Sequence, residues 1–149
     1  MERVKELFRQ YRDDVYRLAV SYPHSVQEAG DVCQTVFLKL LEQENITPGK
    51  EKAWLMQVTA NQCKNLLRSG WWKKTEPIDE TLSVRPPEVN EVLWVVMGLE
   101  PKYRVVVYLH YYEGYTAREI GTLLGISTSA VTTRLDRARQ MLREKLTEV

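Results

Sequence analysis

Hydrophobic positions at the start of the chain recur at intervals of three and four residues, the spacing of one face of an α-helix. The first such stripe ends at Pro23, and the second predicts a helix over roughly 26–43. Turn residues at Pro48 and Gly49 separate it from a third predicted helix over roughly 51–69. The two stripes are Val4, Leu7, Phe8, Tyr11, Val15, Leu18 and Tyr22, and Ala29, Val32, Cys33, Val36, Phe37, Leu40 and Leu41.

The third predicted helix has one polar and one apolar face. At about 100° per residue, the polar face consists of Gln57, Asn61, Lys64, Asn65 and Arg68. The opposite face consists of Leu55, Met56, Thr59, Cys63, Leu66 and Leu67. A row of amides and cations is most often an ordinary solvated face. Surface helices usually mix Glu with Lys, however, and this row has no acid, which favours an anionic partner.

Helical periodicity resumes after a segment that shows none. Residues 70–88 contain Pro77, Pro86 and Pro87 and most of the acidic cluster, and they are predicted to be a linker. A short apolar stripe follows; it consists of Val89, Val92, Leu93 and Val96 and stops at Gly98. Pro101 suits the first turn of the next helix, which is predicted to run to Gly114 as a C-cap residue.

Residues 115–146 carry the most specific pattern in the chain. Thr116 and Glu119 form a capping box at the start of one helix, and Gly121 allows close approach of the next. Gly125 supplies the positive φ of a tight turn, and Ser127 caps a second helix. The second helix has Val131, Leu135, Ala138, Leu142 and Leu146 inside and Ser129, Thr132, Thr133, Arg137 and Gln140 outside. This order is typical of a helix-turn-helix, whose second helix enters the major groove of DNA; a mere helical hairpin is the plainer alternative.

Composition narrows the class of protein. The 149 residues are 44% hydrophobic and 28% charged, which is a globular composition. No apolar run approaches the roughly 20 residues that span a bilayer, and the charged N-terminus does not resemble a signal peptide. Two cysteines cannot form a disulfide framework, so we expect a reduced, cytoplasmic protein. A redox pair of Cys33 and Cys63 is conceivable, but both lie on apolar faces, which favours inert core thiols.

Charge is distributed unevenly beneath a net charge of +1. Residues 50–75 hold six basic side chains and one acidic side chain, whereas residues 76–100 hold one basic and six acidic. Residues 101–149 hold eight basic and five acidic side chains. Two basic segments that flank an acidic one suit a polyanion, although chance clustering on a solvated surface is the plainer interpretation.

An enzyme is not favoured by the residues that usually carry catalysis. His24 and His110 are the two histidines, and they are far apart in the sequence. Neither is accompanied by a carboxylate pair, a Gly-rich phosphate loop or the spacing of metal ligands. We therefore expect no catalytic residue, no metal site and no cofactor.

Motifs in both halves of the chain point to one family. In the first half they are Phe8…Tyr11…Val15-Tyr16-Arg17-Leu18-Ala19, Asp31-Val32-Cys33-Gln34-Thr35-Val36-Phe37-Leu38 and Trp54-Leu55…Val58…Asn61…Arg68. In the second half they are Leu99-Glu100-Pro101 through Arg104, Leu109, Glu113-Gly114, Glu119-Ile120 and Val131…Arg134-Leu135…Arg137-Ala138-Arg139…Leu142. The set resembles regions 2 and 4 of bacterial sigma-70-family factors, and more specifically the extracytoplasmic-function (ECF) group. Gly30 and Gly121 depart from the pattern, since the family usually has an acid and an alanine there.

The resemblance implies an all-α fold of two small helical domains. A region 2-like bundle would occupy 1–73 and a region 4-like helix-turn-helix domain 88–149, joined by a flexible linker over 74–87. It implies a sigma factor that binds core RNA polymerase and promoter DNA and directs transcription initiation in the cytoplasm. The free chain would be a monomer that does not insert into membranes, and an anti-sigma factor is a further candidate partner.

The resemblance also assigns roles to residues. The polymerase-binding set is Asp31, Gln34, Phe37 and Leu38, although a core position is favoured for Phe37. The minus-ten element would be bound by Asn45, Thr47, Asn61, Lys64, Asn65 and Arg68. The minus-thirty-five element would be bound by Ser127, Thr128, Ser129, Thr132, Thr133, Arg137, Arg139 and Arg143.

Three further residues of these elements have open assignments. Trp54 is a possible stacking surface for a base, but a buried Trp at a helix start is favoured. Arg139 points about 160° away from Arg137, so it is either a flanking phosphate contact or a support for the neighbouring helix. Asp136 repels phosphate and must face a base edge, a cation or open water.

A stand-alone helix-turn-helix regulator is the main alternative function. It predicts tight DNA binding without polymerase, usually by a dimer whose symmetry matches a palindrome. The sequence offers no obvious dimerisation helix.

Overall fold

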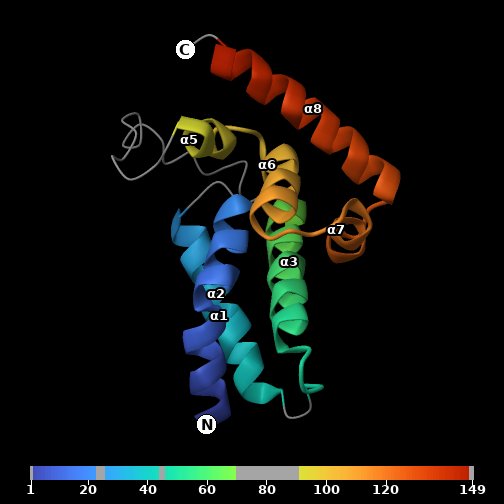
Figure 1. The fold of residues 1–149 in the computed structure, drawn as a ribbon. Helices are drawn as coiled ribbons and strands as arrows, with labels where there is room; N and C mark the ends of the chain where they lie inside the picture. The colour runs from blue at the N-terminus through green and yellow to red at the C-terminus, as the bar shows by residue number, and fades with distance from the viewer. Residues whose placement is uncertain (1, 23–25, 44–45, 70–90, 148–149) are drawn as a thin grey trace. The chain divides into compact units, whose positions relative to one another are not determined.

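The computed structural model describes residues 2–22, 26–43, 46–69 and 91–147, and the elements in this part of the chain are helices (Figure 1). This confirms the all-α fold expected from the sequence. The chain divides into two compact units, Met1–Glu76 and Pro77–Val149. The linker expected over 74–87, together with Val89 and His24, lies outside the described residues.

Unit 1 is a bundle of three helices: α1 (Glu2–Ser21), α2 (Val26–Glu42) and α3 (Glu51–Ser69). Each of the three contacts the other two. The predicted helices over 26–43 and 51–69 are therefore confirmed to within a residue. A tight turn leads into α3, in which the Lys50 amide donates to the Thr47 carbonyl at 3.0 Å and Gly49 has a φ of 86°. The core consists of Leu7, Val15, Leu18, Ala19, Tyr22, Ala29, Val32, Val36, Phe37, Leu40, Ile46, Leu55, Met56, Thr59, Ala60 and Cys63.

Some residues of the predicted apolar stripes lie at the surface instead. The side chains of Phe8 and Leu41 are 42% and 49% exposed. Both belong to stripes that are wider than the surface that two neighbouring helices cover. The rings of Phe8 and Phe37 meet edge to face, with their centroids 4.8 Å apart, so Phe8 covers a core residue while remaining open to solvent.

Unit 2 contains α5 (Glu91–Met97), α6 (Pro101–Val107), a π-helical turn η2 (Tyr108–Tyr112), α7 (Ala117–Leu124) and α8 (Thr128–Thr147). Helix α8 contacts α5, α6 and α7. Helix α6 is buried on almost every side, with Lys102 as its one exposed side chain, which explains its run of β-branched residues. The apolar stripe predicted before α6 is only partly buried. Val96 is buried but Val92 is exposed, and the side chain of Leu93 is outside the described set.

The helix that begins at Pro101 does not continue as an α-helix to Gly114. It widens into a π-turn at Tyr108, where the amide of Glu113 donates to the Tyr108 carbonyl at 3.2 Å, five residues back. The Tyr115 amide then donates to the Leu109 carbonyl at 2.9 Å, and Gly114 has a φ of 77°. π-turns of this kind often lie at functional sites.

The helix-turn-helix of α7 and α8 is confirmed in its local detail. The Glu119 amide donates to Thr116 Oγ1 at 3.1 Å and the Thr116 amide to Glu119 Oε1 at 2.9 Å, which completes the capping box. Gly125 has a φ of 74°, in the left-handed region that favours glycine. A Cβ on Gly121 would lie 2.7 Å from the Ile126 carbonyl oxygen, so the close approach predicted at Gly121 is that of the turn before α8.

Candidate functional site

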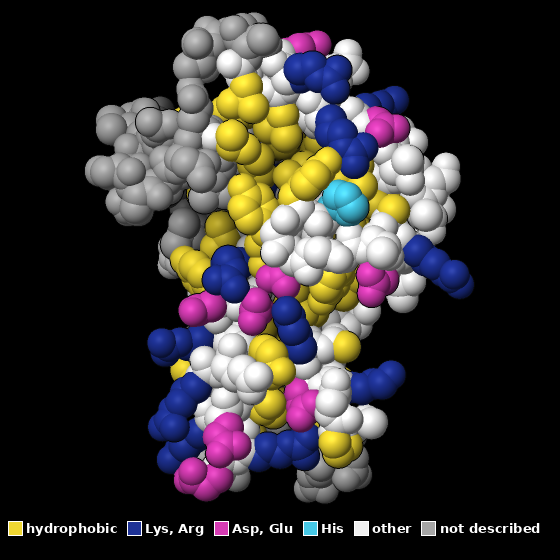
Figure 2. All heavy atoms as spheres, viewed as in Figure 1, with side chains coloured by type: hydrophobic (Ala, Val, Ile, Leu, Met, Phe, Trp, Pro, Cys, Tyr) yellow, Lys and Arg dark blue, Asp and Glu magenta, His cyan; other side chains and the backbone are white. Residues whose placement is uncertain are grey.

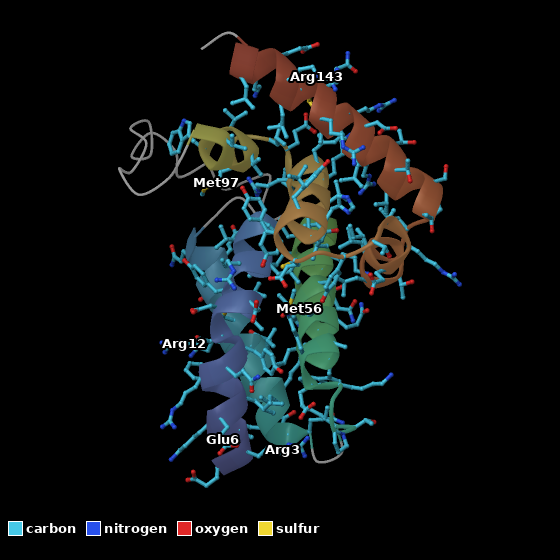
Figure 3. The ribbon with its side chains drawn as sticks, in the orientation of Figure 1. Arg3, Glu6, Arg12, Met56, Met97 and Arg143 are labelled. Atoms are coloured by element: carbon cyan, nitrogen blue, oxygen red, sulfur yellow. The ribbon has the colours of Figure 1, made fainter. Side chains whose placement is uncertain are left out.

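The polar face of α3 is built as its periodicity predicts. Asn61 and Asn65 are exposed, and Gln57 and Lys64 are half-buried beside them. The Gln57 side-chain amide donates to Asn61 Oδ1 at 3.1 Å, which orders the two amides into one surface. The opposite face packs into the bundle through Leu55, Met56, Thr59 and Cys63, and Met56 is labelled on α3 in Figure 3. Arg68 lies in the last turn of α3, and its side chain is outside the described residues.

The turn before α3 is tied to the first helix. Arg3, which extends from α1 in Figure 3, donates from Nη2 to the Ile46 carbonyl at 3.4 Å and lies 3.5 Å from the Glu51 carboxylate. The backbone amide of Glu51 itself, and then those of Gly49 and the Arg3 charge, hold the pKa of the Glu51 carboxyl below its ordinary value. Thr47 is exposed in this turn. Asn45 lies outside the described residues.

Trp54 lies on the side of α3 that carries the polar face. It is half-buried rather than buried, which corrects the preference for a core Trp. It stands seven residues before Asn61, and seven residues are two helical turns, so the two side chains are within about 20° of one another around α3. This spacing was readable from the sequence. The arrangement places an accessible aromatic surface beside the row of amides.

The outer side of α2 carries the residues assigned to polymerase. Asp31, Gln34 and Leu38 are exposed, with Leu38 55% exposed, whereas Phe37 is buried. Phe37 is 9% exposed, which agrees with the core position favoured for it. The four residues therefore do not form one uniform exposed set.

A shallow apolar groove runs between α1 and α2. Its hollow of about 430 Å³ is lined by Val4, Lys5, Phe8, Arg9, Arg12, Phe37, Leu38 and Leu41. A second hollow of about 560 Å³ on the same two helices includes Tyr16, Gly30, Cys33 and Gln34. The Arg12 guanidinium lies over the Phe8 ring, 5.9 Å from its centroid. Figure 2 shows basic and apolar side chains exposed together on unit 1. This groove could not be predicted from the sequence, because Phe8 and Leu41 fitted a core stripe.

Helix α8 presents the predicted outer face to solvent. Seven of the eight residues assigned to the minus-thirty-five element are exposed: Ser127, Thr128, Ser129, Thr132, Thr133, Arg137 and Arg143. Two of their hydroxyls make hydrogen bonds to the backbone of the helix. Ser127 Oγ accepts from the Ala130 amide at 3.0 Å as the N-cap, and Thr132 Oγ1 donates to the Thr128 carbonyl at 3.0 Å. Arg143 lies towards the C-terminal end of α8 in Figure 3.

Arg139, the eighth, is half-buried and bound within the protein. Its Nε donates to the Tyr111 hydroxyl at 2.5 Å and its Nη1 to Asp136 Oδ1 at 2.9 Å. Its guanidinium lies 5.7 Å from the centre of the Tyr111 ring. The hydrogen bond with Tyr111 raises the pKa of Arg139, which stays charged. This geometry matches the supporting role considered for Arg139, and a phosphate contact by it stays a prediction.

Tyr111 is a residue of this site that the sequence reasoning missed. It lies in η2, 28 residues before Arg139, and is 54% exposed. No local spacing links the two residues, so only the tertiary structure brings them together.

The two cysteines have the properties of unreactive thiols. Burial raises the pKa of Cys33 to about 11 and that of Cys63 to about 12, with the neighbouring Cys33 and Glu28 adding to the shift at Cys63. Both are free thiols. Within the described ranges, no cluster of His, Cys, Asp and Glu could hold a metal ion, and no helix has the length and apolar character to cross a bilayer.

Comparison with known families matches both units. A model of sigma-70 region 2 matches residues 7–73, and a model of sigma-70 region 4 matches residues 91–142. Two curated relatives are ECF RNA polymerase sigma factors. SigE of Mycolicibacterium smegmatis is 30% identical over 95% of this chain and 60% of its own length, and SigM of Bacillus subtilis is 29% identical over 94% and 93%.

The relatives differ in how much of their length this chain spans. It spans 60% of SigE and 38% of the probable sigma factor RfaY of Xanthomonas campestris pv. campestris, which is 26% identical over 91% of this chain. Among solved structures, the fold is similar to that of the sigma factor RpoE of Bartonella quintana, crystallised with the anti-sigma factor NepR. That structure has a TM-score of 0.74 and 18% identity, and the match covers 99% of this chain and 98% of the other.

Proposed function

The chain belongs to the sigma-70 family of RNA polymerase sigma factors, in the ECF group, and on that premise we propose that it binds core polymerase and directs it to promoters. One observation carries the proposal: the chain holds an acid-free amide and cation face on α3 together with a complete helix-turn-helix in α7 and α8. Such a protein acts as a monomer in the cytoplasm and adds binding rather than catalysis to the polymerase.

In this proposal α8 reads the minus-thirty-five element as duplex DNA. The first turns of the helix present Ser129, Thr132 and Thr133, which are short enough to let the backbone approach base edges. Arg137 and Arg143 extend further and suit phosphate contacts, which position the helix without reading sequence. A recognition helix contacts base edges with its N-terminal residues, which in α8 are the short hydroxyl side chains, while the arginines follow later.

The face of α3 is proposed to hold the minus-ten element as a single strand. The amides of Asn61 and Asn65 are exposed donors and acceptors for the edges of unpaired bases. Trp54, half-buried on the same side, offers a stacking surface, and such stacking is worth about 1–3 kcal/mol per base. Lys64 and Arg68 supply charge for the backbone, and Asn45 and Thr47 complete the site from the preceding turn.

Polymerase is proposed to dock on unit 1 along α2. The exposed apolar side chain of Leu38 lies beside the polar groups of Asp31 and Gln34, which is the mixture expected of a transient protein interface. The groove beside it, with its basic rim, extends this surface onto α1. An anti-sigma factor is a further candidate partner for the same unit. We place the functional boundary at 1–73 and 88–149, with 74–87 as the connection.

Two separate recognition faces make the free chain a weak DNA binder. Each face is small, and simultaneous binding of both carries an ordering cost that polymerase removes when it fixes their spacing. A stand-alone regulator has the opposite property, since it binds its operator tightly without polymerase.

Run-off transcription on genomic DNA fragments tests the proposal directly. Core polymerase with the chain should start transcripts at defined sites that core polymerase alone does not use. Leu38→Ala should reduce these transcripts, whereas Lys39→Ala, an exposed neighbour on α2, should not. Absence of chain-dependent start sites, combined with nanomolar sequence-specific binding by the isolated chain, would favour the stand-alone regulator.

A further inference from the structure

We propose that Asp136 reads a cytosine of the upstream promoter element and that Arg139 and Tyr111 hold it in position for this contact. The inference rests on the proposed function, because it assigns a base preference to one residue of the helix that reads the minus-thirty-five element.

Asp136 lies on the base-reading side of α8. At about 100° per residue it falls within about 40° of Thr132 and 20° of Ser129, and it follows them by one and two turns. Its side chain is 66% exposed. A side chain at this position points to the same groove as the two hydroxyls.

A carboxylate in this place needs a compensating charge, because the phosphates of DNA repel it. Arg139 supplies that charge through the hydrogen bond of its Nη1 to Asp136 Oδ1 at 2.9 Å. Arg139 is in turn held by Tyr111, whose hydroxyl accepts from Nε at 2.5 Å and whose ring lies under the guanidinium. The three groups are joined by hydrogen bonds in a series that begins at Tyr111 on η2 and ends at Asp136 on the outer face of α8. The carboxylate is neutralised and directed while most of it remains accessible.

The chemistry of the groove then selects the base. An ionised carboxylate only accepts hydrogen bonds. Guanine presents two acceptors in the major groove and thymine one acceptor and a methyl group, so neither suits it. Adenine presents an amino donor beside the N7 acceptor, which repels a carboxylate. Cytosine presents the N4 amino group alone, so Asp136 fits cytosine best.

The test uses the full chain with core polymerase and a promoter library randomised across the upstream element. Sequencing of the transcripts gives the base preference at each position. The wild-type chain should favour cytosine at one position by roughly tenfold, within the range typical of a base contact. Asp136→Asn should lose that preference and gain one for adenine, because an Asn side chain pairs with adenine N6 and N7.

Glu144→Gln is the matched control. It removes one acid from the exposed surface of α8, two turns beyond Asp136, and should keep the cytosine preference. If Asp136→Asn raises transcription from all sequences alike and leaves the base preference as in the wild type, the carboxylate acts only as a charge and the inference is wrong.

Tyr111→Phe separates positioning from folding. It keeps the ring under Arg139 and removes the hydroxyl that accepts from Nε. We expect the cytosine preference to fall severalfold at that position while preferences at other positions and the circular dichroism spectrum are retained. A uniform loss across all positions would reduce Tyr111 to a structural support. Absence of any chain-dependent transcript would overturn the proposed function as well, whereas normal transcription without an Asp136-dependent position would overturn this inference alone.

Discussion

Replacing Arg104 by Met should destabilise unit 2 more than its position on a short helix suggests. Arg104 is only 8% exposed, and its Nη1 donates to the Met97 carbonyl at 3.0 Å and the Leu99 carbonyl at 3.4 Å. Met97 is the last residue of α5, so its carbonyl lacks an intrahelical donor. Arg104 therefore closes the corner between α5 and α6. The corner adjoins a core cluster of Val96, Leu99, Tyr103, Val107 and Ala138.

The expected loss in the free energy of unfolding follows from the two carbonyl acceptors that lose their donor when Arg104 is replaced. A hydrogen bond to a charged group contributes about 1.5–3 kcal/mol, and the longer second contact adds less. Met relieves the penalty of a buried cation, which often makes such replacements neutral when both partners are exchanged. Here the partners are backbone carbonyls that no substitution removes, so both lose their donor, and the Leu99 carbonyl loses it in a buried position. We expect a net loss of about 2–3 kcal/mol, which for a unit of this size lowers the melting temperature by roughly 10–20 °C.

Urea titration of the full chain, followed by the backbone NMR signals of α6, reports on unit 2 separately from unit 1. Arg118→Met is the control, because Arg118 is exposed on α7 and the chemical change is the same. Arg104→Met should move the unfolding midpoint to lower urea by the amount above, and Arg118→Met should leave it within about 0.5 kcal/mol of the wild type. Equal midpoints for the two variants would refute the reasoning that the carbonyls need Arg104.

Three further outcomes are expected. Asn61→Ala should reduce open-complex formation in a permanganate footprint while the helical circular dichroism signal is retained; loss of that signal would mean that Asn61 is structural. Thr132→Ala should change which upstream sequences are accepted, by about 1–3 kcal/mol of discrimination, in the same library selection. Cys33 and Cys63 should resist iodoacetamide at pH 8, since pKa values raised from 9.0 to about 11 and about 12 keep them protonated, and both should react once the chain is unfolded. The contribution of the two protonated thiols to the free energy of unfolding is complete below pH 9 and is lost as the pH rises towards those folded pKa values. Rapid labelling of native Cys63, measured by mass spectrometry, would contradict its buried position.

Local signals account for the parts of the structure that the sequence predicted. The capping box at Thr116 and Glu119, the positive φ at Gly125 and the Ser127 cap each depend on residues within a few positions of one another. The helix-turn-helix could therefore be placed to the residue. The same holds for α2 and α3, whose bounds follow from a strong stripe and from turn residues on either side.

The parts that could not be predicted depend on distant contacts. The bond between Tyr111 and Arg139 joins residues 28 positions apart, and no local pattern marks the π-turn at Tyr108. Phe8 has the spacing of a core residue, but whether a stripe position is covered depends on how far the partner helices reach. No residue near Arg104 in the sequence indicates that its side chain caps the end of α5.

The burial of α6 on almost every side has a consequence for how unit 2 opens. The amide protons of Val105, Val106 and Val107 lie inside the unit, and they can exchange with solvent only when the unit unfolds as a whole. Near the end of α8 the side chains of Arg143 and Lys145 are exposed, whereas Met141 and Leu142 pack against the core cluster. Hydrogen exchange should therefore fall into two classes, with a slow core at α6 and faster exchange at the end of α8 beyond Leu142, so that this end can open while the core of the unit stays closed.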